Sequence, residues 1–555
     1  MSTSPDLVIL NGALITFDPT LPRASALAVR DGVIVAVSDC NTIRAMVGPA
    51  TRVIDAQGST VLPGFIDSHV HLFGGSVELE YLDLGGKTGF EAVTTAVRAR
   101  SAADPNVRMI FAVQADYSLF GAGHRTTRHD LDRVLPERPF AIFASDHHTI
   151  WANTRALALA GLLGGGATEV GSEIVMGRDG LAEGELREPG AYARVLALTP
   201  YGGRDLAGLV SGKNPEPPAT AAQRAADLGA IRRGLQHCAS HGITGLHNMD
   251  GSFYTMELLA ELEAEGDLIC RTEVPFHLKS VDTFERFAEA EEMRRLWSSD
   301  RLWCNRVKMF MDGVVESHTA LMLRPYPGSD HVGDAVFEPE PFNLACIEAD
   351  RRGFQIATHA IGDLAVRRTL DGYQAARDAN GARDARHRIE HIETLHPDDL
   401  PRFADMGIVA SYQPGHAPFG HIYTAGAIEP HLHDDQKPLA YAWKTLRDAG
   451  NKVIFSTDWP VIKVDVMATL RAATAPVPMP APWGDQRQTL LDALASCTAD
   501  NAWVEFNEHR KGRLKAGFMA DIVVMRDDLE GMEHDRFETT GAAFTISGGT
   551  VVFEA

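Results

Sequence analysis

VLPGFIDSHVHL, residues 61–72, is a short and mostly apolar run that ends in two histidines. It predicts a buried β-strand, because runs of this length and composition are typical of strands inside a sheet. His69 and His71 lie two residues apart, so both side chains project from one face of the strand. Two imidazoles that converge at one strand end can hold a divalent cation. The H-x-H pattern by itself also fits hydrogen-bonded core histidines.

Seven more segments of the same kind follow, and most of the gaps between them hold an amphipathic helical pattern such as residues 364–379. Alternation of strands and helices predicts an α/β fold with parallel strands. Eight such units predict a (β/α)8, TIM-like barrel with the active site at the carboxyl ends of the strands. The expected strands lie in residues 61–72, 242–250, 271–278, 305–313, 354–363, 387–393, 408–415 and 452–460.

Both ends of the chain predict additional β-structure. Residues 1–60 and 508–555 hold short β-branched runs separated by tight-turn pairs such as Asn11-Gly12. Because the termini of a domain often lie close together, we expect one composite β-sandwich domain built from both ends. Two unrelated β-edges on the larger domain are the alternative.

The connection after the first expected strand is unusually long. About 170 residues separate it from the second, far more than an ordinary βα connection. We therefore expect an inserted subdomain over residues 75–225, above the barrel mouth. The metal-dependent barrel itself is then expected to span residues 61–74 and 226–507.

Composition limits the partners and the location. The 555 residues include 52 Lys+Arg and 74 Asp+Glu, a net charge of −22, which argues against a nucleic-acid partner. No apolar run reaches the ~18 residues of a membrane span, and the N-terminus has no signal-peptide pattern. Six scattered cysteines without a C-x-x-C pair predict neither disulfides nor a thiolate metal site, which indicates a reducing cytoplasm. A homo-oligomer is left open.

Four further residues lie in the carboxyl-terminal parts of other expected strands. They are Lys308, His359, His391 and Asp458. A lysine inside an apolar strand needs a partner, and Asp312 or Glu316 could supply it. Alternatively, a buried neutral amine can take up CO2 to form a carbamate that bridges two metals as a carboxylate would. Each of these residues alone fits a position in the core or at the rim of the barrel. A purely structural role does not easily explain all of them together with His69 and His71.

The segments GFIDSHVHL, VKMFMDGVVESHTA, ATHAIGD, HRIEHIETL and STDWPV, in this order, resemble the amidohydrolase superfamily, and within it the family-3 branch of metal-dependent hydrolases. The similarity extends to both chain ends and to residues 145–161. The resemblance implies a binuclear metal centre on a barrel with a β-sandwich. It assigns His69 and His71 to one metal, His359 and His391 to the other, carboxylated Lys308 as the bridge, and Asp458 as ligand and proton shuttle.

Weaker candidates surround this set. In DHHTIWAN, residues 146–153, His148 and Trp151 lie where the family lines its substrate pocket, although a helix N-terminus with a surface histidine fits equally. The segment after Lys308 departs from the common family form, so His318 is a further substrate-binding candidate. His416 follows the seventh expected strand and is another. His247 and Asp250 end the second strand and are expected to orient metal ligands.

The predicted activity is metal-dependent hydrolysis of a C–N bond in a small molecule, of the amide, N-acyl or N-formyl type. A water with its pKa lowered by the metal to about 7 would attack, and Asp458 would shuttle its proton. The ligand types suit Zn2+ best, and Mn2+, Fe2+ and Co2+ also fit, with one or two ions per chain. Hydrolysis of an ester or lactone, deamination of a heterocycle, and a barrel without catalysis are the alternatives.

Overall fold

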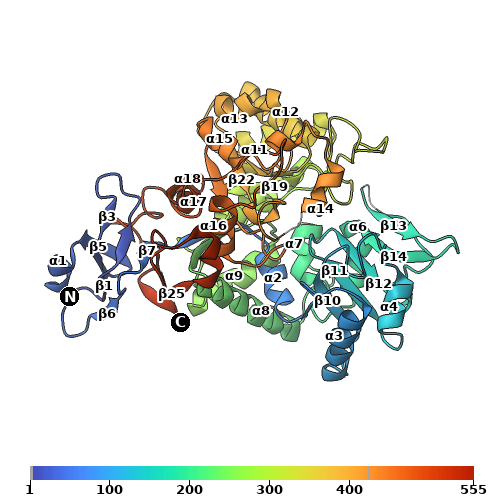
Figure 1. The fold of residues 1–555 in the computed structure, drawn as a ribbon, viewed down its shortest axis with the longest axis horizontal. Helices are drawn as coiled ribbons and strands as arrows, with labels where there is room; N and C mark the ends of the chain where they lie inside the picture. The colour runs from blue at the N-terminus through green and yellow to red at the C-terminus, as the bar shows by residue number, and fades with distance from the viewer. Residues whose placement is uncertain (1–3, 169–170, 423–424) are drawn as a thin grey trace.

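The computed structural model describes residues 4–168, 171–422 and 425–555. Figure 1 shows three regions in a row. Strands of the N-terminal segment lie at one end, parallel strands and helices lie in the middle, and residues of the segment 82–187 form the other end. The α/β fold predicted from the sequence is confirmed.

Short strands of the middle region form two sheets, in the orders β18-β16-β15-β8 and β17-β19-β20-β21-β22-β23. All neighbouring strands in them run parallel. Every strand residue except Phe310 is buried, as expected for parallel sheets covered on both faces. Each of the eight expected segments contains at least one strand. The bounds are β8 Phe65–Val70, β15 Ile243–Asn248, β16 Arg271–Glu273, β17 Phe276–His277, β18 Leu302–Trp303, β19 Arg306–Phe310, β20 Gln355–Ala360, β21 Arg388–His391, β22 Val409–Tyr412 and β23 Val453–Phe455.

The two parallel sheets meet at β8 and at the end of β23. Val70 forms a parallel bridge with Trp459. The Asp458 N–H donates to the His69 carbonyl at 2.8 Å, and the His71 N–H donates to the Trp459 carbonyl at 2.7 Å. At the other side, β16 and β17 follow each other in the chain but belong to different sheets. The carboxyl ends of the first and last expected strands are therefore neighbours.

Helices follow most of these strands, and their sequences explain their position. In α12, Ala365, Val366, Leu370 and Tyr373 recur at helical spacing and are buried on one face. Helix α8 starts at a capping box in which Thr220 and Gln223 bond each other's backbone N–H groups. The bounds are α2 Leu72–Glu78, α8 Ala221–Ser240, α9 Phe253–Glu265, α10 Phe287–Leu296, α11 Pro339–Arg351, α12 Asp363–Asn380, α13 Leu400–Met406, α14 Ala425–Ile428, α15 Trp443–Asp448, α16 Val466–Thr474, α17 Leu490–Ser496 and α18 Ala499–Val504.

The segment after α2 forms a six-stranded sheet of its own, in the order β13-β14-β12-β11-β10-β9. Strand β11 shows how it is covered: Ala141 and Phe143 face one apolar cluster, whereas Phe140 and Ile142 face another. Alternation along the strand thus buries both faces of the sheet. The bounds are β9 Leu82–Asp83, α3 Phe90–Ala103, β10 Ile110–Ala115, α4 Arg128–Val134, β11 Phe140–Ala144, β12 Thr149–Ala152, α5 Thr154–Ala160, β13 Glu173–Met176, β14 Ala182–Arg187, α6 Pro189–Leu196 and α7 Ala207–Val210.

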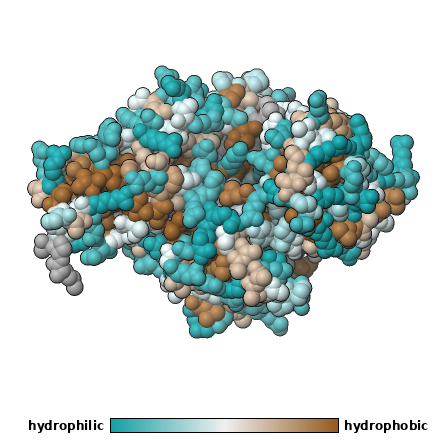
Figure 2. All heavy atoms as spheres, turned by 90° about the horizontal axis from the view of Figure 1, so that it is seen from below, coloured by the Kyte–Doolittle hydropathy of each residue, from teal (hydrophilic) through white to brown (hydrophobic). Residues whose placement is uncertain are grey.

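Strands from both chain ends lie together. Sheet β26-β25-β24-β7-β2-β3 joins them, with β24 antiparallel to β7, and sheet β5-β4-β1-β6 shares an apolar cluster with it. Figure 2 shows hydrophobic side chains gathered at this end of the molecule. The bounds are β1 Leu7–Leu10, β2 Ala13–Ile15, β3 Arg23–Ala24, β4 Ala26–Arg30, β5 Val33–Ser38, α1 Cys40–Arg44, β6 Arg52–Asp55, β7 Thr60–Pro63, β24 Ile522–Met525, β25 Ala542–Ser547 and β26 Thr550–Glu554.

Within residues 4–168, 171–422 and 425–555, no helix combines the length and apolar character that crossing a bilayer requires.

Candidate functional site

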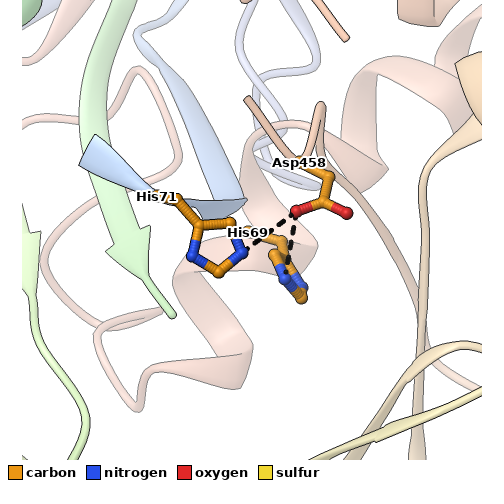
Figure 3. A group of neighbouring side chains, drawn as sticks. All are labelled: His69, His71 and Asp458. Atoms are coloured by element: carbon orange, nitrogen blue, oxygen red, sulfur yellow. Dashed lines mark ion pairs between the residues drawn. The ribbon is translucent and has the colours of Figure 1, made fainter. Parts of the chain in front are cut away.

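His69, His71 and Asp458 converge where β8 and β23 end (Figure 3). The Oδ1 atom of Asp458 lies 3.3 Å from His69 Nε2 and 3.4 Å from His71 Nε2. One donor atom from each of the three residues falls within 4.8 Å of the others, a spacing that could hold a metal ion. The strand period of two, read from the sequence, thus places both imidazoles beside one carboxylate.

The backbone around Asp458 explains how that carboxylate is aimed. Asp67 on β8 accepts hydrogen bonds from the Thr457 N–H at 3.0 Å and the Thr457 hydroxyl at 2.6 Å. Asp458 itself has a φ of 60°, in the left-handed region that aspartate tolerates better than most residues. The turn after β23 is therefore tied to β8 by contacts on both sides of the Asp458 peptide.

A second donor group contains His391, His416 and Asp458. The Oδ2 atom of Asp458 lies 3.8 Å from His391 Nδ1 and 3.9 Å from His416 Nε2. His391 ends β21, and His416 lies in η4, Pro414–His416, after β22. His416 was predicted to contact substrate, but its position fits a metal ligand as well.

His359, predicted as the partner of His391, lies on β20 beside this second group. Its ring centroid is 4.5 Å from that of His391. Its Nε2 atom makes a 3.1 Å hydrogen bond to the Gly313 carbonyl, so in this tautomer Nε2–H is the donor. His359 is outside both donor groups found among the described residues.

Lys308 on β19 is fully buried. Among the described residues its Nζ atom has no hydrogen-bond partner and no ion pair, and it lies 4.6 Å from the centre of the Phe310 ring. Asp312, one of the two partners considered from the sequence, instead accepts backbone N–H groups of Leu321, Ile361 and Gly362. Burial lowers the pKa of Lys308 to about 8, although nearby carboxylates oppose the shift. Within the described residues, this amine is therefore a buried group of the site that no protein atom pairs with.

Glu390 and Arg388 orient the imidazole of His69, and neither residue was predicted from the sequence. His69 Nδ1 lies 2.8 Å from Glu390 Oε2, and the Arg388 guanidinium binds both Glu390 oxygens. This contact directs the Nε2 lone pair of His69 toward Asp458. Burial lowers the pKa of His69 to about 4 and would raise that of Glu390, but Arg388 and His69 hold the pKa of Glu390 well below its usual range. The two charged residues Arg388 and Glu390, two positions apart on one face of a fully buried strand, were the available clue.

Other polar contacts orient the remaining ligand candidates. His391 Nδ1 lies 2.8 Å from Gln413 Oε1. Asp250, predicted to orient a ligand, lies 3.7 Å from His71 Nδ1. Burial alone would lower the pKa of His71, but Asp250 and Asp458 outweigh it and raise the pKa to about 9.

His247, the other residue predicted to orient a ligand, contacts Glu505 at 3.0 Å and Arg388 at 3.1 Å. Through Arg388 it is linked to Glu390 and so to His69, a metal-ligand candidate. Burial lowers its pKa to about 3.

A cavity opens over both donor groups. Its lining includes His148, which pairs with Glu188 at 2.9 Å and whose ring centroid lies 6.1 Å from that of His359. Burial would lower the pKa of His148, but Glu188 outweighs it and raises the pKa to about 9, so the imidazole is a cationic donor at neutral pH. The lining also includes Glu316 and Glu393, which sequence reasoning did not propose as ligand contacts.

The two other substrate-binding candidates lie elsewhere. Trp151 on β12 is buried with its ring edge against Tyr117, inside the core of the inserted sheet. His318 stacks on Tyr326 and contacts His431 Nδ1 at 2.7 Å. Neither Trp151 nor His318 is among the described residues that line the cavity.

Fold and site together define an α/β protein with a buried histidine and carboxylate centre under an accessible cavity. A protein-family model described as "Amidohydrolase family" matches residues 52–553, so the chain belongs to the amidohydrolase family. The class of enzyme predicted from the sequence, a hydrolase of the amidohydrolase type, is thereby confirmed.

Comparisons with known proteins agree over nearly the whole length. Protein LONG AFTER FAR-RED 3 of Arabidopsis thaliana is 28% identical over 94% of this chain and 87% of its own. N-substituted formamide deformylase of Arthrobacter pascens is 24% identical over 95% of this chain and 94% of its own. The crystal structure of an uncharacterized metal-dependent hydrolase from Pyrococcus horikoshii superposes with a TM-score of 0.70 at 23% identity, covering 93% and 96% of the two chains.

Proposed function

We propose that this protein is a metal-dependent hydrolase that cleaves the C–N bond of an amide, N-acyl or N-formyl compound of small size. The observation that carries the proposal is the pair of donor groups that share Asp458 beside a buried lysine without a partner. The relative named N-substituted formamide deformylase supports the choice of bond. Complete donor groups argue against a barrel that has lost catalysis.

We also propose the domain organisation expected from the sequence. The parallel strands between β8 and β23 would form a (β/α)8 barrel over residues 61–74 and 226–507. Residues 1–60 and 508–555 would form the composite β-sandwich, and residues 75–225 the inserted subdomain. The contacts between β8 and the end of β23 support closure of the barrel, and the pairing of β24 with β7 supports the composite domain.

The residues fit a divalent metal centre. Asp458 Oδ1 is a buried oxygen without a hydrogen-bond partner among the described atoms, beside the two imidazole Nε2 atoms of His69 and His71. Nitrogen and oxygen donors of this kind suit Zn2+. We propose that the metal candidates are His69, His71 and Asp458 for one ion, and His391 with His359 or His416 for another. Carboxylated Lys308 would bridge the two.

When bound, a divalent cation would supply a water of lowered pKa and would polarise the substrate carbonyl. Asp458 would accept a proton from the attacking water and return it to the departing amine nitrogen. Net cleavage consumes one water and releases a carboxylic acid and an amine. His148, cationic through its contact with Glu188, would donate a hydrogen bond to the carbonyl oxygen as charge develops there.

A panel of substrates tests the proposed bond. Zinc-loaded protein is offered N-formyl and N-acetyl alkylamines, a lactone, an ester and an aminopurine, and released amine, acid and ammonia are measured. We expect amine release from the formyl or acetyl amines. Turnover of the lactone and ester alone would instead assign a carboxylic-ester hydrolase, and ammonia from the aminopurine alone would assign a deaminase. Asp448→Asn, at an exposed ion pair on α15, is the control variant and should keep the wild-type kinetics.

Removal of the Lys308 amine is expected to lower metal content. Zinc-reconstituted wild-type protein should hold up to about two ions per chain, and Lys308→Ala should hold about one or fewer. Short carboxylic acids such as acetate should restore part of the loss by taking the place of the carbamate. The measurement is metal analysis after gel filtration. Lys452→Ala, at an exposed lysine paired with Asp500, should keep the wild-type content. Retention of both ions by Lys308→Ala without added acid would exclude the carbamate bridge.

A further inference from the structure

Glu316 and Glu393 bring carboxyl groups to the cavity outside the set of metal-ligand candidates. Glu393 follows β21 and is 5% exposed, and Glu316 lies in the connection after β19 and is partly buried. The two groups interact electrostatically: burial raises the pKa of Glu393 most, and the charge of the Glu316 carboxylate raises it next. Two carboxyl groups are therefore concentrated on one part of the cavity wall.

One of these carboxyl oxygens makes no hydrogen bond of normal geometry, although the Tyr441 side chain favours the ionised Glu393 carboxylate. Glu393 Oε2 is buried and has no hydrogen-bond partner among the described residues. A buried polar oxygen left in this state is costly, and native proteins usually pair such groups with protein, water or ligand. Glu393 lines the cavity, so a ligand that enters the cavity can approach this carboxyl group.

His148 is a cation that acts on both groups, but it is already paired with Glu188. Asp146 and Glu188, which also line the cavity, already have partners: Asp146 accepts from the Tyr117 hydroxyl, and Glu188 pairs with His148. Lys279 is the one lysine or arginine among the described lining residues, and its Nζ donates to the Val210 carbonyl at 2.8 Å. A cation from outside would therefore be attracted to Glu316 and Glu393.

This acidic part of the cavity lies close to the chemistry. His148 interacts electrostatically with Glu316 and Glu393, and its ring lies 6.1 Å from that of His359. The side chains of Leu278, Phe310, Val314 and Ile361 add apolar wall to the same cavity. A substrate with a short apolar segment between its amide and a basic group would match both features.

We propose that Glu316 and Glu393 form a subsite for a cationic nitrogen group, an ammonium, amidinium or guanidinium, so that preferred substrates are N-acyl or N-formyl compounds with a second, basic nitrogen. The subsite rests on the proposed hydrolase function for its role in substrate choice. Its binding of a cation does not depend on turnover. Charge-assisted hydrogen bonds from the cation would satisfy Glu393 Oε2 and would be stronger than bonds to a neutral group.

Matched substrates test the preference. N-formyl-1,4-diaminobutane and N-formylpentylamine have almost the same length but differ in a terminal ammonium against a methyl group. We expect kcat/KM to be at least about tenfold higher for the basic compound, as for a hydrogen bond to a charged group. Glu393→Gln and Glu316→Gln should each bring this ratio toward one, whereas Glu340→Gln, on the exposed face of α11, should leave it unchanged. Because the comparison uses the ratio of two kcat/KM values, an equal loss of activity toward both substrates does not change it. An unchanged ratio in both cavity variants would overturn the subsite.

A binding measurement separates this proposal from the proposed function. Butylguanidinium and the neutral N-butylurea are titrated into zinc-loaded and metal-free protein by calorimetry. We expect butylguanidinium to bind at least about tenfold more tightly than the urea in both forms, and Glu393→Gln to remove the difference. If neither formamide is hydrolysed, the hydrolase proposal fails while this titration still decides the subsite. Equal binding of the two probes to the wild-type protein would reject it.

Discussion

Replacement of Asp458 by asparagine is expected to lower kcat/KM for a hydrolysed amide by about 10²- to 10⁴-fold. Asparagine keeps the shape of the side chain but cannot accept the proton of the attacking water. Burial would favour a neutral Asp458, but the imidazoles of His69 and His71 hold its pKa well below its usual range, so the carboxylate is available as a base. The measurement is steady-state kinetics on the best formyl or acetyl amine of the substrate panel.

Two controls make this result interpretable. Metal analysis and circular dichroism of Asp458→Asn should show bound metal and a wild-type fold, because the histidine donors remain. Asp448→Asn, in the exposed pair with Lys444, should keep wild-type kinetics. A metal-loaded Asp458→Asn protein with kcat within a few-fold of wild type would reject the proton-shuttle role.

Replacement of Arg388 by methionine is expected to destabilise the protein by about 3–5 kcal/mol, the usual result when one partner of a buried ion pair is removed. Arg388 is fully buried, binds both oxygens of Glu390, and also donates to the Ser68 carbonyl at 2.9 Å and the Ser411 hydroxyl at 2.7 Å. Without it, Glu390 keeps a buried charge whose remaining hydrogen-bond partner among the described residues is His69. Urea-induced unfolding, followed by fluorescence, measures the loss.

An exposed pair provides the comparison. Arg295 binds Glu292 at 2.6 Å on α10, with both side chains in solvent, so Arg295→Met should change stability by less than about 1 kcal/mol. A similarly small change for Arg388→Met would show that the buried Arg388–Glu390 network does not stabilise the fold.

The predicted strands were found because their sequence features are local. A short apolar run with period-two histidines, as in residues 64–72, specifies a buried strand and the common face of His69 and His71 without knowledge of other segments. The same reasoning located Asp458, since it lies just beyond the apolar run of β23, after Ser456 and Thr457. The paired chain ends were also expected, because both have the turn-separated pattern of small β-domains.

The contacts that orient the site were not predictable in this way. Glu390 meets His69 from a segment far away in the chain, and nothing in HRIEH says which strand lies beside β21. Gln413 was missed as a partner of His391 for the same reason. The family resemblance suggested Trp151 and His318 as substrate contacts, but neither lines the cavity among the described residues. Trp151 on β12 packs into a core, and a turn with φ of 61° at His318 precedes a ring that stacks on Tyr326.

The sequence by itself therefore determined the α/β class, the family resemblance and the residue types of a candidate metal centre, because these depend on spacing within single segments. The tertiary structure alone decided that Asp458 is shared by two donor groups, that His416 lies as close to it as His391, and that Lys308 is left without a partner. It also decided that Glu316 and Glu393 face the same cavity. These features arise from packing between segments that are distant in the chain, where burial and neighbouring charge set the chemistry of each side chain.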